Sequence, residues 1–261
     1  MDTGTTDFAR RQRALADHLG SQAPVDLETG TIVVLPSTTF PVAELRKITG
    51  IQFYEQRMLF TTLLLARPGV RLVYVTSVPV DEAVIDYYLR FLADPAGARH
   101  RLTMITLHQP GPLALSEKLV DRPDILTLVR QAVGDTEGAF VLPFNVTPAE
   151  RLVGEALGMA LYGSPAELAH LGSKSGARHV ARRAGVPILV GAEDLRSLPA
   201  VDAAIAAIRD RRPDAPAVVL KLNEGFSGQG NAIVEVGGPP GTALVDRPTT
   251  FCAAGESWPS F

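Results

Sequence analysis

A glycine-rich loop carries the strongest chemical signal in the chain. Its glycines have the spacing G-x-x-G-x-G at Gly225, Gly228 and Gly230. Because glycine has no Cβ, the backbone N–H groups of such a loop can approach an anionic ligand closely. Lys221 lies just before the loop and interrupts an apolar run, so on a strand covered on both faces its ammonium would need a partner. The pattern predicts a flap that covers the phosphate groups of a ligand. A mobile hairpin with a surface lysine is the alternative.

The segment after this loop separates several classes of site. A P-loop or a dinucleotide-binding fold needs a helix there, whose N-terminal amides bind the phosphates. Residues 231–236 instead have the composition of a strand, and the glycine spacing is not G-x-G-x-x-G. The loop also misses the G-x-S-x-G elbow of serine hydrolases by its last residue. We therefore exclude a P-loop and a dinucleotide-binding fold, regard a serine hydrolase as disfavoured, and retain a hairpin flap, of the kind that protein kinases place over ATP.

Lys174 is a second candidate phosphate ligand. Only four of the 25 basic residues are lysines. Ser173 is a good N-cap, which places Lys174 in the first turn of its helix, where a cation opposes the helix dipole at a cost of about 0.5 kcal/mol. This placement suggests an anionic ligand near the helix start, and a solvated lysine is the alternative. Arg178 and Arg182 continue the same helix face and are expected to form a solvated basic stripe.

Other charged residues give weaker signals. The five histidines lack any metal-ligand spacing, and one cysteine cannot make a zinc site, so we predict no metal site built from protein ligands alone. Glu55 and Arg57 lie close together on an expected buried helix. Structural pairing of these two side chains is the default interpretation, and a substrate role is the alternative.

Composition and charge restrict the possible partners and location. The chain has 261 residues and a net charge of −3, which gives no field to attract nucleic acid or a membrane surface. Its longest apolar stretch, residues 58–66, is about half the ~20 residues that span a bilayer. The single Cys252 fits a reducing compartment. We expect a cytoplasmic protein without nucleic-acid or membrane partners, whose oligomeric state the sequence leaves open.

Strand-like and helix-like segments alternate along the first part of the chain. Helix-like segments lie at 51–66, 81–93 and 123–133, between strand-like segments at 31–35, 70–76, 101–107 and 139–143. In the helix at 51–66, a spacing of 3.6 residues places Met58, Leu63 and Ala66 in the buried stripe. This order predicts an α/β fold, in which a mainly parallel sheet carries helices on both faces.

The pattern changes near Gly163. Capping boxes at Thr147 and Ser164 mark two helix starts, and further helices are expected at 174–184 and 201–211. The strands at 217–222 and 231–236 then form a β-hairpin around the glycine-rich loop. We therefore predict two domains, residues 1–165 and 166–261, the second a small α+β domain.

Several motifs together resemble the ATP-grasp superfamily, most closely its branch of pheganomycin-type peptide ligases, which are carboxylate–amine ligases. In the second domain the matching segments are GSKSGAR (172–178), AGVP (184–187) and VVLKLNEGFSGQGNA (218–232). In the first they are LPS (35–37), YEQR (54–57), YVTS (74–77) and KLVDRP (118–123). The resemblance covers nearly the whole chain. It implies a pre-ATP-grasp domain at 1–165 and the N-terminal lid part of an ATP-grasp domain at 166–261.

The resemblance also implies an activity. Such an enzyme phosphorylates a carboxylate with ATP, and an amine attacks the acyl phosphate to form an amide. Lys174 and Lys221 would contact the nucleotide phosphates. The flap would consist of Gly225, Ser227, Gly228 and Gly230, with a hydrogen bond donated by Ser227. The expected partners are ATP, magnesium, and a small-molecule carboxylate with an amine or peptide; no catalytic residue is assigned.

One departure from the family limits this assignment. The magnesium ligands and the adenine hinge of the family lie beyond the flap hairpin, whereas the chain stops at Phe261. We therefore expect a truncated protein, whose C-terminal part and metal ligands lie beyond Phe261. A phosphotransferase with a glycine-rich flap remains an alternative. A noncatalytic nucleotide-binding or interaction module is another, if the protein ends at Phe261. The roles of Glu55, Arg57 and Lys118 are left open.

Overall fold

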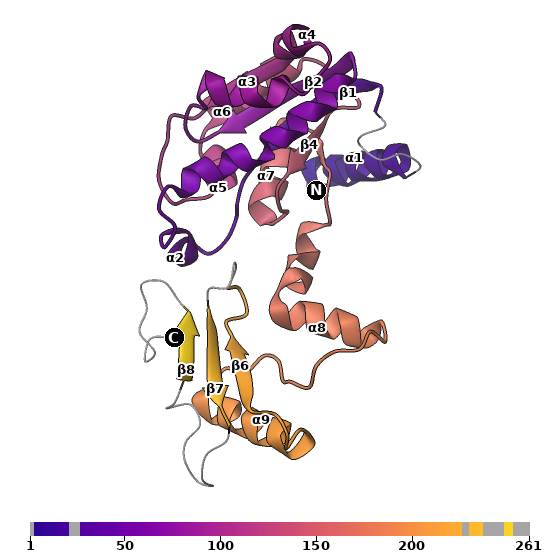
Figure 1. The fold of residues 1–261 in the computed structure, drawn as a ribbon. Coiled ribbons are helices and arrows are strands. Elements are labelled where there is room, and N and C mark those ends of the chain that lie inside the picture. Colours follow the sequence, from indigo (N-terminus) through magenta and orange to yellow (C-terminus); the bar gives the residue numbers. More distant parts are fainter. Residues whose placement is uncertain (1–2, 21–26, 226–229, 237–247, 253–261) are drawn as a thin grey trace. The chain divides into compact units, whose positions relative to one another are not determined.

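A computed structural model describes residues 3–20, 27–225, 230–236 and 248–252 (Figure 1). The chain forms two compact units, Met1–Glu167 and Leu168–Phe261. Each unit is described by itself below. In the described part of the chain, no helix combines the length and the apolar character needed to cross a membrane.

The first unit is built on a five-stranded, wholly parallel sheet. Its strands have the spatial order β3-β2-β1-β4-β5, so the direction of winding reverses between β1 and β4. The strands are β1 (Thr29–Leu35), β2 (Gly69–Thr76), β3 (Leu102–Thr106), β4 (Phe140–Pro143) and β5 (Ala160–Leu161). The predicted parallel sheet is confirmed. The short edge strand β5 was not predicted, because two residues carry no recognisable period.

Helices cover both faces of this sheet, as predicted. Side chains alternate between faces along β1, with Ile32 and Val34 in one apolar core and Val33 and Leu35 in the other. The first core also receives side chains from η2 (Ile51–Ala66), α3 (Glu82–Leu89) and α4 (Pro95–His100). The second core receives them from α5 (Leu115–Val120), α6 (Pro123–Val133) and α7 (Pro148–Leu157). Helices α1 (Thr3–Leu19) and α2 (Val42–Leu45) also belong to this unit.

The helix at 51–66 differs from its prediction. It is a 3₁₀ helix, η2, in which side chains three residues apart lie on one row. Two rows are buried, at 55, 58 and 61 and at 59, 62 and 65, whereas the row at 57, 60, 63 and 66 is exposed. The predicted burial of Leu63 and Ala66 is therefore wrong, because it assumed 3.6 residues per turn. The 3₁₀ period turns Glu55 into the interior.

The second unit contains the predicted β-hairpin. Strands β6 (Ala217–Lys221) and β7 (Asn231–Glu235) pair antiparallel, and β8 (Pro248–Cys252) extends the sheet. One face packs on helix α9 (Leu198–Arg211) through Ile205, Val218 and Val234. The other face is open, since Val219 is 53% exposed. Helix α8 (Lys174–Arg183) follows η3 (Ala166–Gly172), a short 3₁₀ helix where the sequence predicted a capped helix from Ser164.

Candidate functional site

The start of helix α8 is held by its own cap. Ser173 has an extended backbone, and its Oγ accepts a hydrogen bond from the backbone N–H of Gly176 at 3.1 Å. This confirms the predicted N-cap and places Lys174 in the first turn. Gly176 also has a steric role, because a Cβ there would lie 2.2 Å from the carbonyl oxygen of His170. The backbone of residues 170–171 can therefore pack directly against the helix start.

Asn223, in the loop after β6, ties that loop to the same helix start. Its backbone carbonyl accepts from the N–H of Lys174 at 3.3 Å, and its side-chain Oδ1 accepts from the N–H of Ser175 at 2.9 Å. Ser173 Oγ accepts from the N–H of Gly176, so the N–H groups of three successive residues, 174–176, already have hydrogen-bond acceptors within the protein. An anion near this helix start would therefore meet the Lys174 ammonium rather than these amides. Asn223 was not predicted as a site residue, because no local pattern indicates a contact with a residue 48 positions away.

Lys174 and Lys221 lie close enough to influence each other. Nζ of Lys174 donates a hydrogen bond to the carbonyl oxygen of Gly225 in the glycine-rich loop. Burial lowers the pKa of Lys174 below its usual value, the ammonium of Lys221 lowers it further, and the carboxylate of Glu224 opposes both effects. Two ammonium groups that repel each other beside a glycine-rich loop would be stabilised by a shared anion.

Lys221 ends strand β6, in register with Asn231 of β7. Its side chain is exposed, since α9 covers only the opposite face of this sheet. The strand is not covered on both faces at this residue, and Lys221 is a surface lysine, as in the alternative interpretation of the hairpin. Its ammonium needs no internal partner and is accessible to a ligand.

The structure describes two of the four predicted flap residues. Gly225 closes a turn on Leu222, and its carbonyl receives the Lys174 ammonium. Gly230 has a φ of +71°, which favours glycine, and its carbonyl accepts from the N–H of Leu222 at 2.8 Å. Ser227 and Gly228 lie outside the described residues. The role of all four in ligand binding stays a prediction.

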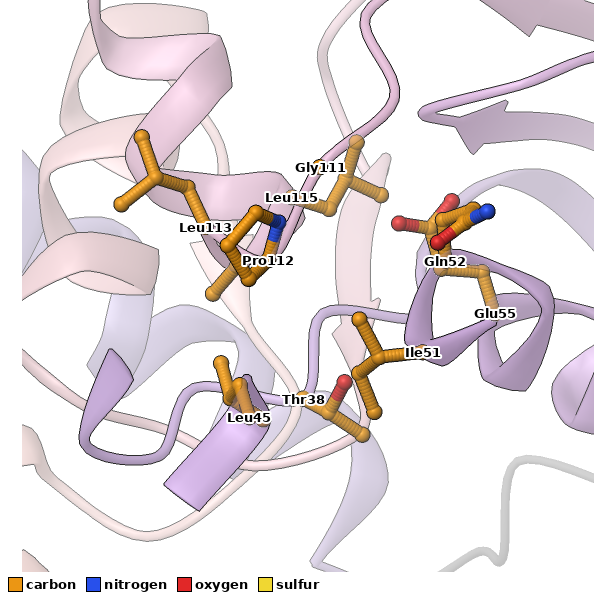
Figure 2. A pocket seen from close by; sticks show the side chains of 10 residues that line it. Thr38, Leu45, Ile51, Gln52, Glu55, Gly111, Pro112, Leu113 and Leu115 are labelled. Atoms are coloured by element: carbon orange, nitrogen blue, oxygen red, sulfur yellow. The ribbon is translucent and has the colours of Figure 1, made fainter. Parts of the chain in front are cut away.

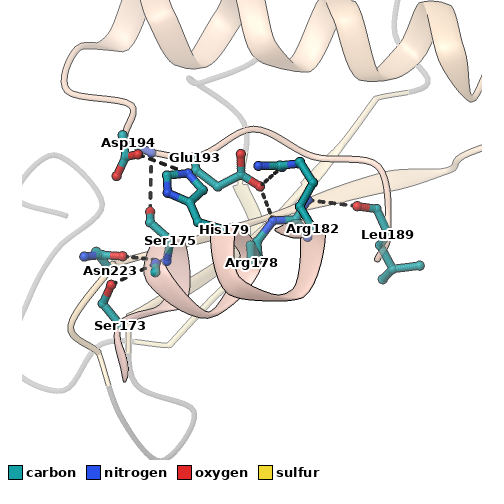
Figure 3. A network of polar contacts seen from close by, with 10 residues as sticks. Ser173, Ser175, Arg178, His179, Arg182, Leu189, Glu193, Asp194 and Asn223 are labelled. Atoms are coloured by element: carbon teal, nitrogen blue, oxygen red, sulfur yellow. Dashed lines mark hydrogen bonds and ion pairs between the residues drawn. The ribbon is translucent and has the colours of Figure 1, made fainter. Parts of the chain in front are cut away.

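The expected solvated stripe on α8 is instead an ion-pair network (Figure 3). Arg178 and Arg182 both donate to Oε1 of Glu193, Arg182 at 2.8 Å, and Arg178 also donates to the carbonyl of Leu189 at 2.9 Å. Burial favours a raised pKa for Glu193, but the hydrogen bonds from both arginines outweigh it and lower the pKa. This network holds the segment at 189–194 against α8. The prediction was wrong because the partner lies in an irregular segment without a recognisable pattern.

Glu55 and Arg57 do not form the expected pair. Glu55 is buried and bonded to Ser77, whereas the guanidinium of Arg57 lies over the ring of Tyr54 at 4.2 Å. In a 3₁₀ helix, positions two apart point to different sides, which separates these two side chains. Among the described residues, no group of three or more His, Cys, Asp or Glu side chains could hold a metal ion. We therefore assign no described residue to magnesium.

The cap at Ser173 gives a direct test of how the site is positioned. Ser173→Ala should cost about 1 kcal/mol of helix stability and speed amide exchange in residues 174–183 about fivefold. Hydrogen-exchange mass spectrometry measures this effect. Ser164→Ala is the matched control, because Ser164 begins no regular helix. Equal effects of the two substitutions on α8 would contradict a capping role for Ser173.

Comparison with known proteins gives one informative relative. No protein-family model matches the chain. The chain is 31% identical over 186 residues to the L-propargylglycine--L-glutamate ligase of Streptantibioticus cattleyicolor. The match covers 69% of this chain and 39% of the relative, so the chain spans well under half the length of the ligase that it matches. This similarity to a ligase supports the resemblance drawn from the sequence, which is to the peptide-ligase branch of the ATP-grasp superfamily.

Proposed function

We propose that the protein is an ATP-dependent carboxylate–amine ligase and that its second unit binds the nucleotide phosphates. The main observation is that the Lys221 ammonium lowers the pKa of Lys174, whose own ammonium is bound to Gly225 of the glycine-rich loop. Homology to a ligase supports the reaction class. In this proposal residues 1–165 form the pre-ATP-grasp domain, and residues 166–261 form the lid part of the ATP-grasp domain.

The described residues fit a polyphosphate group. The charge of Lys221 acts on Lys174, the side chain of Lys221 is exposed, and Asn223 holds the loop after β6 against the start of α8. Positioning and charge neutralisation are the main ways by which proteins accelerate phosphoryl transfer. Lys174 and Lys221 would neutralise phosphate oxygens, and Asn223 would hold the loop in place.

The proposed reaction has two steps. ATP supplies the γ-phosphoryl group to a substrate carboxylate, which gives an acyl phosphate and ADP. The nitrogen of the amine then attacks the acyl carbon, the C–N bond forms, the C–O bond to phosphate breaks, and inorganic phosphate leaves with a proton released from nitrogen. The named relative joins L-propargylglycine to L-glutamate. We extend only its class to this protein and propose amino acids or short peptides as the acid and the amine.

A product analysis tests this function. The protein is incubated with magnesium, ATP, L-glutamate and a panel of aliphatic amino acids, and the products are identified by mass spectrometry. We expect an amide product together with equal amounts of ADP and phosphate. A phosphorylated acceptor without free phosphate would favour the phosphotransferase alternative. If the protein neither binds nor turns over Mg-ATP, this result contradicts the proposal and favours a noncatalytic module.

A further inference from the structure

The outer side of helix η2 is apolar. Its exposed row, at 57, 60, 63 and 66, contains Phe60, Leu63 and Ala66, and its buried rows contain Met58 and Leu59. A surface helix normally carries polar side chains on its solvent side, and a helix with apolar side chains all round is normally buried. The sequence of η2 therefore indicates that its outer row is covered when the protein functions.

Buried polar contacts fix the rotation of η2. The carboxylate of Glu55 accepts from the N–H and Oγ of Ser77 at 2.5 and 2.6 Å, and Ser77 Oγ accepts from Nζ of Lys118 at 2.9 Å. The hydroxyl of Tyr74 donates to the carbonyl oxygen of Glu55 at 2.6 Å. Figure 2 shows the side chains around a hollow beside Glu55, which has room for about one water molecule. Rotating η2 to bury its outer row would break these contacts, so the row can be covered only from outside.

Helix α3 extends the apolar surface. Helices η2 and α3 pack together on one face of the sheet and send side chains into the same core (Figure 1). Ile85 and Leu89 of α3 are buried, whereas Tyr87 and Phe91 point outward with ring centroids 5.4 Å apart. We call the outer surface of these two helices the η2–α3 face. Its large apolar side chains are each 46–61% exposed: Phe60, Leu63, Tyr87 and Phe91. Extended apolar surfaces of this kind are typical of interaction sites.

The charges on α3 indicate what the partner is. Asp86 and Arg90 are four residues apart, and both are exposed. Within the described part of the chain neither side chain has an ion-pair partner, and the guanidinium of Arg90 lies over the ring of Tyr87 at 4.9 Å. In a two-fold contact, residue i of one copy meets residue j of the other and the reverse. Two antiparallel α3 helices would therefore pair each Asp86 with the Arg90 of the other copy.

The size of the face sets the expected strength of such a contact. η2 is about 32 Å long, because each of its 16 residues rises about 2.0 Å in a 3₁₀ helix. Two packed helices are together about 20 Å wide. A two-fold contact over this face would bury on the order of 1,000 Å² in total, at the lower end of specific interfaces. We therefore expect a reversible dimer with a dissociation constant in the micromolar range.

We propose that the η2–α3 face is a self-association surface, on which a second copy of this chain packs about a two-fold axis. Phe60, Leu63, Tyr87 and Phe91 form its apolar centre. Reciprocal pairs of Asp86 and Arg90 fix the antiparallel orientation of the two α3 helices. The face contains none of the residues assigned to nucleotide binding, so dimerisation does not rest on the proposed ligase function.

Sedimentation velocity of the full chain, without nucleotide and over about 2 to 200 μM, tests this inference. We expect the mass to rise from 27.8 kDa toward twice that value as the concentration increases. A monomer at every concentration would overturn the proposal and leave the face to a different partner. Species that grow beyond the dimer would also overturn it, because a two-fold contact closes after two copies.

A substitution in the exposed row locates the contact. Leu63→Glu places a charge in the apolar centre, so we expect it to raise the dissociation constant at least about tenfold while the circular dichroism spectrum stays native. Leu128→Glu is the matched control, because Leu128 is also about half exposed and belongs to α6, on the opposite face of the sheet. Equal self-association of the two variants would refute the η2–α3 face.

A charge exchange tests the orientation. Asp86→Arg would place two arginines opposite each other and should weaken the dimer about fivefold or more. Adding Arg90→Asp to this variant restores the opposite charges in reverse order, so dimerisation should recover. Nonspecific apolar association would not show this recovery. Failure of the double variant to dimerise better than Asp86→Arg alone would overturn the two-fold contact.

Discussion

Lys221→Ala should lower kcat/KM for ATP by about 10- to 100-fold, the usual effect of losing a charge-assisted hydrogen bond to phosphate. The side chain is exposed at the end of β6, so its removal takes away no packing and should leave the melting temperature unchanged. The effect on catalysis can therefore be assigned to the lost cation. Steady-state kinetics of ADP release, with ATP varied, measures it.

Two further measurements check this interpretation. The Lys221 ammonium lowers the pKa of Lys174, so that pKa should rise toward its ordinary value in Lys221→Ala, which NMR titration of the lysine side chain can follow. Arg183→Ala is the control, because it removes an exposed cation at the far end of α8 and should leave ATP kinetics unchanged. Unchanged ATP kinetics in Lys221→Ala itself would contradict the assignment of the glycine-rich loop to the nucleotide site.

The second large effect is expected at Asn223. Asn223→Ala removes the side-chain oxygen that binds the Ser175 N–H and leaves the backbone bond from Lys174, so the glycine-rich loop is held less firmly at the start of α8. We expect KM for ATP to rise about tenfold, which corresponds to a loss of about 1.4 kcal/mol of binding free energy. The change in kcat should be smaller. Faster amide exchange at the start of α8 should accompany this change.

Asn223→Asp separates the structural contribution of this residue from its effect on ligand binding. Aspartate keeps an oxygen acceptor for Ser175, and a carboxylate at a helix start is favourable, so α8 should keep its protection. The added negative charge should nevertheless weaken ATP binding, because it lies beside the lysines that face phosphate. Asn145→Ala, which removes an amide contact with Thr39 in the first unit, should leave KM for ATP unchanged. Normal ATP binding by Asn223→Asp would contradict a phosphate position next to this residue.

Much of the fold could be predicted because its signals are local. The strand at 139–143 was placed within one residue, and helix α6 was placed at its observed bounds, with proline at its first turn and Gly134 at its end. Ser173 predicted the start of α8 because a capping side chain bonds to an amide three residues away. Such contacts depend only on neighbouring residues, so the order of residues is enough to specify them.

The sequence by itself determined the parallel sheet, the hairpin around the glycine-rich loop and the placement of Lys174 at a helix start. Only the tertiary structure decided that Asn223 binds this helix, that Lys221 is exposed, and that Glu55 joins Ser77 and Lys118 rather than Arg57. The physical reason is the range of the interactions. Residues far apart in sequence meet only after the elements pack, and a 3₁₀ rather than an α-helical period at 51–66 changes which side chains face the interior.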